Sequence, residues 1–132
     1  MNLYPSFTVH LTCDDNTRGV YFDGFAQPID SESWIGWDKT TTYFAPANTQ
    51  YIQIKCENSG QLGGLIVEVG NGVVYDSSWK CSSEGFDSGM MPATEINGKQ
   101  MPAGISSNAR WIWTYGYAYS EDDVVYCQKR LY

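Results

Sequence analysis

The segment Leu11–Gly24 constrains the fold more than any other part of this chain. Apolar and polar residues alternate up to Cys13, three side-chain oxygen donors follow at positions 14–16, and the alternation returns at Val20. Asp23-Gly24 then predicts a type I′ turn, which needs positive φ at both central residues. Connections this short cannot lead to a parallel neighbour, so the two reversals predict antiparallel β-structure.

The same period-two alternation recurs along the chain, whereas no helical periodicity extends beyond about one turn. Turn-forming residues separate the alternating runs, so we expect about eight strands in one domain that covers residues 1–132. The expected fold is an all-β, antiparallel β-sandwich of jelly-roll type. Residues 82–108 are the least regular and are expected to fold over one end. The expected strands cover residues 7–13, 20–22, 25–29, 40–44, 51–56, 65–69, 73–79, 109–114 and 124–131.

Counting these strands alternately up and down sorts the loops between the two ends of the sandwich. Loops that follow the upward strands share one end, and the other loops share the opposite end. The first end is predicted to carry residues 14–18, 30–38, 57–64 and 81–108, and the second the turns 23–24 and 71–72 with residues 115–123.

Four cysteines, at positions 13, 56, 81 and 127, provide no Cys-x-x-Cys pair, and His10 is the only histidine. This argues against a structural zinc site. An even count in a small domain favours two disulfides and a secreted, extracellular protein, although buried free thiols would give the same count. Three pairings are open from the sequence. We favour Cys56–Cys81, because both lie near the first end, which leaves Cys13–Cys127.

The composition limits the partners that the chain can bind. A net charge of −7, with only 8 Lys and Arg, provides no basic stripe for nucleic-acid phosphates. It also disfavours an anionic membrane surface. No apolar run reaches the roughly 20 residues of a membrane-spanning helix, so membrane insertion is not expected. The N-terminal sequence does not resemble a signal peptide, so secretion would imply that a leader had been removed.

Four short motifs follow one another in a compatible order. They are Thr12–Asn16 with Tyr21–Gly24, then Trp37–Thr40, then Asp76–Lys80, and finally Ala109–Trp113 with Val125–Lys129. This pattern resembles the galactose-binding-domain-like jelly rolls that accompany bacterial α-L-rhamnosidases, and it is similar to lectin-like modules of invertebrate secreted mosaic proteins. The resemblance covers residues 7–131. It implies binding of a small galactose- or rhamnose-type sugar, and no hydrolysis, because no glycosidase catalytic residue belongs to such a module.

Sugar recognition needs a flat apolar face for the ring and oriented oxygens for the hydroxyl groups, and calcium can bridge both. The resemblance places Asp15 and Asn16 in a calcium-linked sugar site, although Asx-type turn chemistry would also account for them. The first end carries further oxygen-bearing and aromatic residues. The candidate sugar contacts are Asp15, Asn16, Asp30, Trp34, Trp37 and Asn58, and the candidate calcium ligands are Asp14, Asp15 and Glu57.

The tryptophans divide into two groups. Trp34 lies in a polar loop outside the motifs and is the better candidate for stacking on a sugar. The others occupy motif positions in or beside expected strands, where core packing is the favoured interpretation. These are Trp37, Trp79, Trp111 and Trp113.

Three functions compete. The first is a lectin-like module that binds a glycan or small sugar, with calcium as a candidate cofactor. The second is a structural or adhesion module that binds protein partners through an aromatic surface. An enzyme ranks last, because His10 has no evident nucleophilic partner and a small sandwich offers little cleft for a carboxylate pair. The sequence leaves the sugar and the oligomeric state open.

Overall fold

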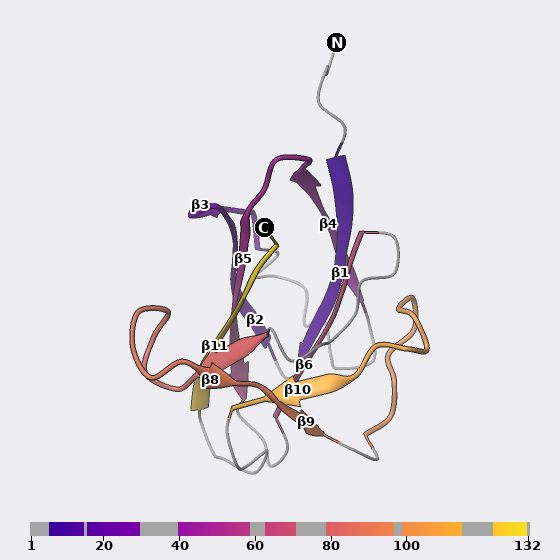
Figure 1. Cartoon of the computed structure of the whole chain (residues 1–132). Coiled ribbons are helices and arrows are strands. Elements are labelled where there is room, and N and C mark those ends of the chain that lie inside the picture. Colours follow the sequence, from indigo (N-terminus) through magenta and orange to yellow (C-terminus); the bar gives the residue numbers. More distant parts are fainter. Residues whose placement is uncertain are drawn as a thin grey trace.

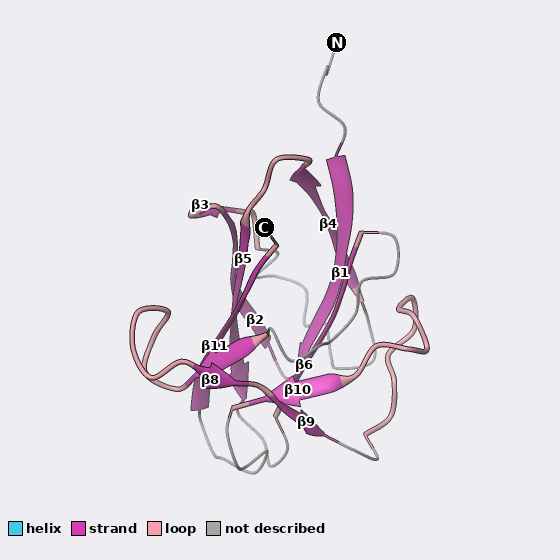
Figure 2. Ribbon diagram, viewed as in Figure 1, coloured by secondary structure: helices cyan, strands magenta, loops and turns pink. Residues whose placement is uncertain are grey.

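The computed structural model of this chain describes residues 6–14, 16–29, 40–58, 63–70, 79–96, 99–114 and 123–131. The described residues form eleven strands and no helix, as Figure 2 shows. Among them, accordingly, no helix has the length and apolar character needed to cross a membrane. The expected all-β, antiparallel fold is confirmed, with more strands than the sequence predicted, several of them only two or three residues long. The expected strand 73–79 lies outside the described residues except for Trp79.

Two antiparallel sheets face each other and enclose the core (Figure 1). Sheet A has the order β4-β1-β6-β10-β9, and sheet B has the order β3-β2-β5-β11-β7-β8. The strands of sheet A are β4 (Thr41–Pro46), β1 (Ser6–Asp14), β6 (Gly64–Val69), β10 (Trp111–Trp113) and β9 (Thr94–Ile96). The strands of sheet B are β3 (Phe25–Ala26), β2 (Asn16–Phe22), β5 (Tyr51–Asn58), β11 (Asp123–Arg130), β7 (Lys80–Ser82) and β8 (Met91–Pro92).

The strands β1 and β2 follow each other directly in sequence but belong to different sheets. Strand β1 pairs with β4 and β6, whereas β2 pairs with β3 and β5. The chain therefore crosses from one sheet to the other between Asp14 and Asn16. Apolar residues of both strands, such as Leu11 and Val20, face the shared core from opposite sides. Alternation alone does not distinguish this arrangement from a hairpin, because both bury the same face of each strand.

The second reversal is the predicted hairpin. Phe22 pairs with Phe25, and the two residues between them have φ angles of 51° for Asp23 and 83° for Gly24. Positive φ at both positions is what a type I′ turn requires, so this prediction is confirmed. The turn Asn71-Gly72, predicted on the same grounds, lies outside the described residues.

The core lies between the sheets and is formed by the inward-facing residues of both. Every second residue of β5, beginning at Ile52, is buried. The side chains of Trp79, Trp111 and Trp113 are among the largest that are fully buried. Trp79 and Trp113 belong to this core, and Trp111 belongs to a second, smaller buried cluster, so all three pack in the interior as predicted. Trp37 lies outside the described part of the chain.

Two disulfides form, as predicted, but the favoured pairing of the cysteines was wrong. Cys13 of β1 binds Cys56 of β5, which links the two sheets through the core, and Cys81 of β7 binds Cys127 of its neighbour β11. All four sulfurs belong to buried residues. The predicted pairing considered only the end of the sandwich near which each cysteine lies. Partner choice depends instead on which strands face or adjoin each other.

The described part of the irregular span 82–108 reaches one end of the sandwich, where Lys99 contacts Asp14, and also extends along both sheets. It contains two short strands, and its connections lie against the outer faces of both sheets, on opposite sides of the molecule in Figure 1. The segment 99–109 covers part of sheet A, where a second small cluster forms around Ile66, Ala109 and Trp111. Because the chain passes from sheet B to sheet A within this span, the strands after it do not follow the predicted alternation of up and down.

The consequence is clearest at the start of β11. Asp123 pairs with Asn58, and Asn16 pairs with Glu57, so β11 begins at the end of the sandwich where Asp14 also lies. We call this the Asp14 end; it is the lower end in Figure 1. The predicted direction of the last strand was wrong, because β11 runs antiparallel to β5. Residues 115–122 of the loop before it, predicted to lie at the opposite end, are outside the described residues.

Candidate binding groove

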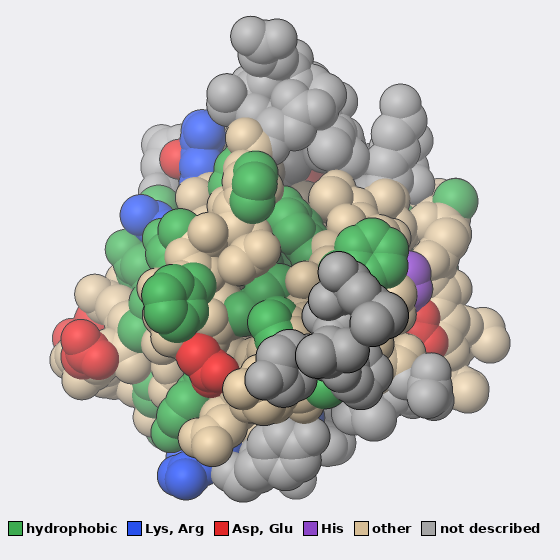
Figure 3. Space-filling model, turned by 90° about the horizontal axis from the view of Figure 1, so that it is seen from above, with side chains coloured by type: hydrophobic (Ala, Val, Ile, Leu, Met, Phe, Trp, Pro, Cys, Tyr) green, Lys and Arg blue, Asp and Glu red, His purple; other side chains and the backbone are tan. Residues whose placement is uncertain are grey.

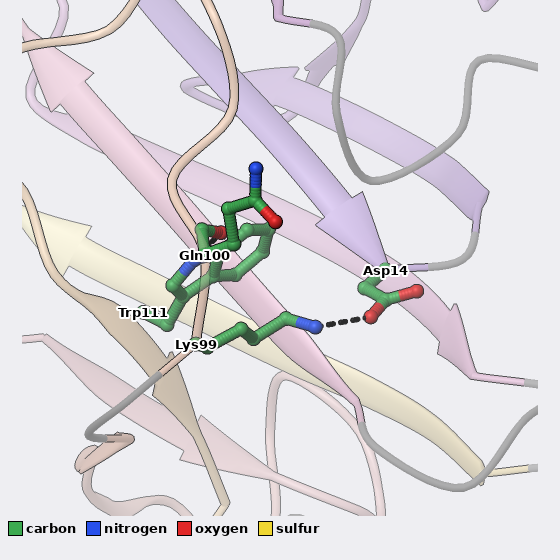
Figure 4. A network of polar contacts seen from close by, with 4 residues as sticks. All are labelled: Asp14, Lys99, Gln100 and Trp111. Atoms are coloured by element: carbon green, nitrogen blue, oxygen red, sulfur yellow. Dashed lines mark hydrogen bonds and ion pairs between the residues drawn. The ribbon is translucent and has the colours of Figure 1, made fainter.

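Two carboxylates of the predicted site at the Asp14 end form ion pairs with other residues of the chain. The ammonium group of Lys99 lies 2.5 Å from Asp14 Oδ2, and each of the two side chains is only 9 % exposed. The same ammonium group lies 4.8 Å from the centre of the Trp111 ring, and Trp111 Nε1 donates to the carbonyl oxygen of Gln100 (Figure 4). This network fastens the segment 99–109 to the end of β1. Asp14 is therefore buried and charge-compensated.

The second described carboxylate of this end is paired as well. Arg18 donates to Glu57 Oε1 over 2.7 Å on the outer face of sheet B, where Arg18 is half exposed. The Glu57 carboxylate raises the pKa of Arg18 through this hydrogen bond and its charge. Asn16, one of the predicted sugar contacts, is partly buried at the start of β2 and registers with Glu57.

Asn58, a predicted sugar contact, does not lie on the surface. Its side chain is fully buried. Ile52, Ile54 and Cys56 face the core, and the period of two along β5 puts Asn58 on the same inner face. This signal was present in the sequence and should have excluded Asn58 from the candidate set.

The described residues include two of the three predicted calcium ligands, Asp14 and Glu57. Asp14 and Glu57 already hold cationic partners, and no group of three or more His, Cys, Asp or Glu side chains that could hold a metal occurs in the described ranges. The other predicted residues lie outside those ranges. They are Asp15, Asp30, Trp34 and Trp37.

A groove on the outer face of sheet B is a candidate site built from described residues. Its volume is about 450 Å³, within the range of about 300–1,000 Å³ that is common for small-molecule sites. The β2–β3 turn forms one wall and the β7–β8 connection forms the other. Between them lie residues of β5 and β11 and the residue just before β5. The lining comprises Asp23, Gly24, Gln50, Tyr51, Gln53, Phe86, Asp87 and Gln128.

The floor of the groove is a cross-strand pair of amides. Gln53 of β5 and Gln128 of β11 are register partners, and Gln53 Nε2 donates to Gln128 Oε1 over 3.1 Å. Each amide thereby orients the other. This bond leaves Gln53 Oε1 as an acceptor and Gln128 Nε2 as a donor for a ligand.

The first wall is held in place by Asp23 itself. Its Oδ1 atom accepts hydrogen bonds from the backbone N–H groups of Gln50, at 2.9 Å, and Tyr51, at 2.8 Å. Its backbone N–H donates to the carbonyl oxygen of Tyr51. The β2–β3 turn is thus tied to the start of β5. Asp23 Oδ2 is not used by these bonds and stays a potential acceptor.

The second wall is anchored by an aromatic contact. The ring of Phe86 meets Tyr21 of β2 edge-to-face at 5.8 Å and Tyr126 of β11 at 5.2 Å. Within the same connection, Ser82 Oγ donates to the Ser88 carbonyl oxygen. These contacts position Asp87, which follows Phe86 and is exposed. Because both walls and the floor are hydrogen-bonded or packed, the groove is preformed.

Sequence reasoning missed this groove, although parts of its signal were visible. The polar members of the alternating runs in β5 and β11, Gln53 and Gln128, mark an outer face that carries amides. The cue that the irregular span would bring Phe86 and Asp87 onto this face is absent from local sequence, since their neighbours are more than 30 residues away.

Comparisons of this chain with protein-family models, with curated proteins and with solved structures find no match. The functional argument therefore rests on the geometry of the groove.

Proposed function

We propose that this chain is a carbohydrate-binding module and that the groove on sheet B holds the sugar. The observation that supports this function most is the combination of carboxylates, side-chain amides and aromatic rings in one preformed hollow. Sugar hydroxyl groups both donate and accept hydrogen bonds, so they match carboxylate and amide partners. The rings of Tyr51 and Phe86 offer apolar surface for the C–H groups of a pyranose.

The proposal keeps the ligand class inferred from the sequence and changes the location of the site. Galactose- and rhamnose-type sugars stay the first ligands to test. The Asp14 end is less suited, because its described carboxylates already have cationic partners. The two buried disulfides fit an oxidising compartment, so we also propose that the protein is secreted.

Glycan-array binding with purified protein tests the proposal. We expect Gln128→Ala and Asp87→Ala each to weaken binding to the preferred glycan about tenfold, as loss of a hydrogen bond from a bound ligand predicts. Glu95→Gln is the matched control, because it changes a carboxylate on β9 of the other sheet that pairs with Arg110. Equal binding by Gln128→Ala, Asp87→Ala and the unchanged protein would refute the proposed site.

A chelator arm on the same array tests the predicted cofactor. Binding that persists in the chelator excludes calcium from sugar recognition. Binding that is lost in the chelator and restored by added Ca²⁺ would support the sequence-based calcium prediction, and it would direct the search to Asp15 and the neighbouring residues.

The exposed aromatic residues favour adhesion to a protein partner as the second candidate function. Phe25 is 75 % and Phe44 is 67 % exposed, which is unusual for such large apolar side chains. Figure 3, which looks onto the end opposite the Asp14 end, shows hydrophobic side chains interspersed with polar ones. Binding to no glycan, with or without chelator, would favour this second function.

A further inference from the structure

We propose that the groove selects sugars by charge: it prefers a sugar with a free amino group to the neutral sugar of the same ring, and it rejects acidic sugars. This inference rests on the proposed function and specifies its ligand class. It follows from the hydrogen-bonding groups and the charges that line the groove.

The lining offers more acceptors than donors. Asp23 Oδ2, both carboxylate oxygens of Asp87 and Gln53 Oε1 are acceptors, whereas Gln128 Nε2 is the donor that the amide pair leaves to a ligand. The Gln50 amide and the Tyr51 hydroxyl can each donate and accept, so they add equally to both sides. An ammonium group supplies three donors and no acceptor. A carboxylate or sulfate on a sugar supplies acceptors only, so it would meet few partners here.

The charges act in the same direction. Two carboxylates line the groove, from Asp23 on one wall and Asp87 on the other, and no Lys or Arg occurs among the described residues that line it. Two described cations flank the lining. Arg130 stacks on the Tyr51 ring, with its guanidinium 5.6 Å from the ring centre, and the exposed Lys80 is the register partner of Gln128. Among the described residues that line the groove itself, the only charged groups are the two carboxylates.

The size of the effect follows from partial exposure of the site. A unit charge on the ligand within about 6 Å of one carboxylate, at an effective dielectric constant of about 40, changes Kd about tenfold. We therefore expect about a tenfold preference for the amino sugar over the neutral sugar. We expect a similar factor between the neutral and the acidic sugar.

The test is a set of immobilised sugar triples in which only the charge changes. Each triple contains a hexose, its 2-amino-2-deoxy form and its uronic acid, in the gluco, galacto and manno series. The measured quantity is the ratio of Kd values within a triple, at about 50 mM and about 500 mM NaCl. The ratio should shrink at high salt, because screening weakens interactions between exposed charges.

Two variants assign the effect to the groove. Asp87→Asn keeps the shape and one acceptor oxygen but removes the charge, so the ratio of amino to neutral sugar should fall severalfold. Glu95→Gln removes the same charge from sheet A and should leave the ratio as it is. A thermal melt of each variant confirms that the fold is retained.

The outcomes separate the two proposals. Amino sugars bound more tightly than neutral ones, with a ratio that Asp87→Asn lowers, support the inference. Acidic sugars bound as tightly as neutral ones, or a ratio that Asp87→Asn leaves unchanged, overturn it while the carbohydrate-binding function stands. Binding to no member of any triple or of the wider array refutes both.

Discussion

Removal of the disulfide that joins the two sheets should be the most informative single perturbation of this fold. Cys13→Ala/Cys56→Ala opens a loop with a sequence separation of 43. The chain-entropy expression for a loop of this length gives a loss of about 4 kcal/mol at 25 °C. Loss of two buried sulfur atoms adds to this value, because both cysteines are at most 2 % exposed.

The matched variant is Cys81→Ala/Cys127→Ala, which opens a loop with a sequence separation of 46. The same expression again gives about 4 kcal/mol. The two loops do not overlap in sequence, so their contributions should add to about 8 kcal/mol when all four cysteines are replaced. A domain of 132 residues is expected to have a total stability of about 7–20 kcal/mol. A loss of about 8 kcal/mol would unfold the cysteine-free variant at the lower end of this range and would leave about 12 kcal/mol at the upper end.

Urea unfolding, followed by tryptophan fluorescence at a common slope, measures these losses. Thiol titration in denaturant measures the pairing directly. The observed pairing leaves no free thiol in Cys13→Ala/Cys56→Ala, whereas the alternative Cys56–Cys81 with Cys13–Cys127 leaves two. A stability loss below about 1 kcal/mol would contradict the loop-closure argument. Two titratable thiols in that variant would refute the pairing.

Three further perturbations test individual contacts. Lys99→Met leaves the buried carboxylate of Asp14 without its ammonium partner. The free energy of unfolding measured in urea should fall by about 3–5 kcal/mol. A loss under about 1 kcal/mol would show that the pair is not buried in solution. Gly63→Ala would place a Cβ atom 2.5 Å from the Trp113 ring and should lower stability by about 1–3 kcal/mol; an unchanged melting temperature would contradict the close packing. Arg18→Gln breaks an ion pair in which Arg18 is 48 % exposed, so the free energy of unfolding should fall by less than about 1 kcal/mol. This loss should be smaller still at high salt. A larger loss would mean that the pair is shielded from water.

The candidate site was predictable only in its chemistry. Oxygen-bearing and aromatic side chains were expected to form a binding surface, and the groove contains both kinds. Its position was not predictable, because its lining comes from the β2–β3 turn, β5 with the residue before it, the β7–β8 connection and β11. No local sequence pattern predicts that Asp87 lies across a groove from Asp23.

The sequence by itself determined the strand periodicity, the buried tryptophans, the participation of all four cysteines and the type I′ turn at Asp23-Gly24. These are local properties, because alternation reports which face of a strand is buried and positive φ is set by the turn residues themselves. Only the tertiary structure decided that β1 and β2 face each other across the core instead of pairing, and that Cys13 meets Cys56. Backbone N–H and C=O groups are alike in nearly all residues, so the alternating pattern of a strand does not determine which strand it pairs with. That choice is made when the apolar faces of the two sheets pack against each other, and the groove on sheet B follows from it.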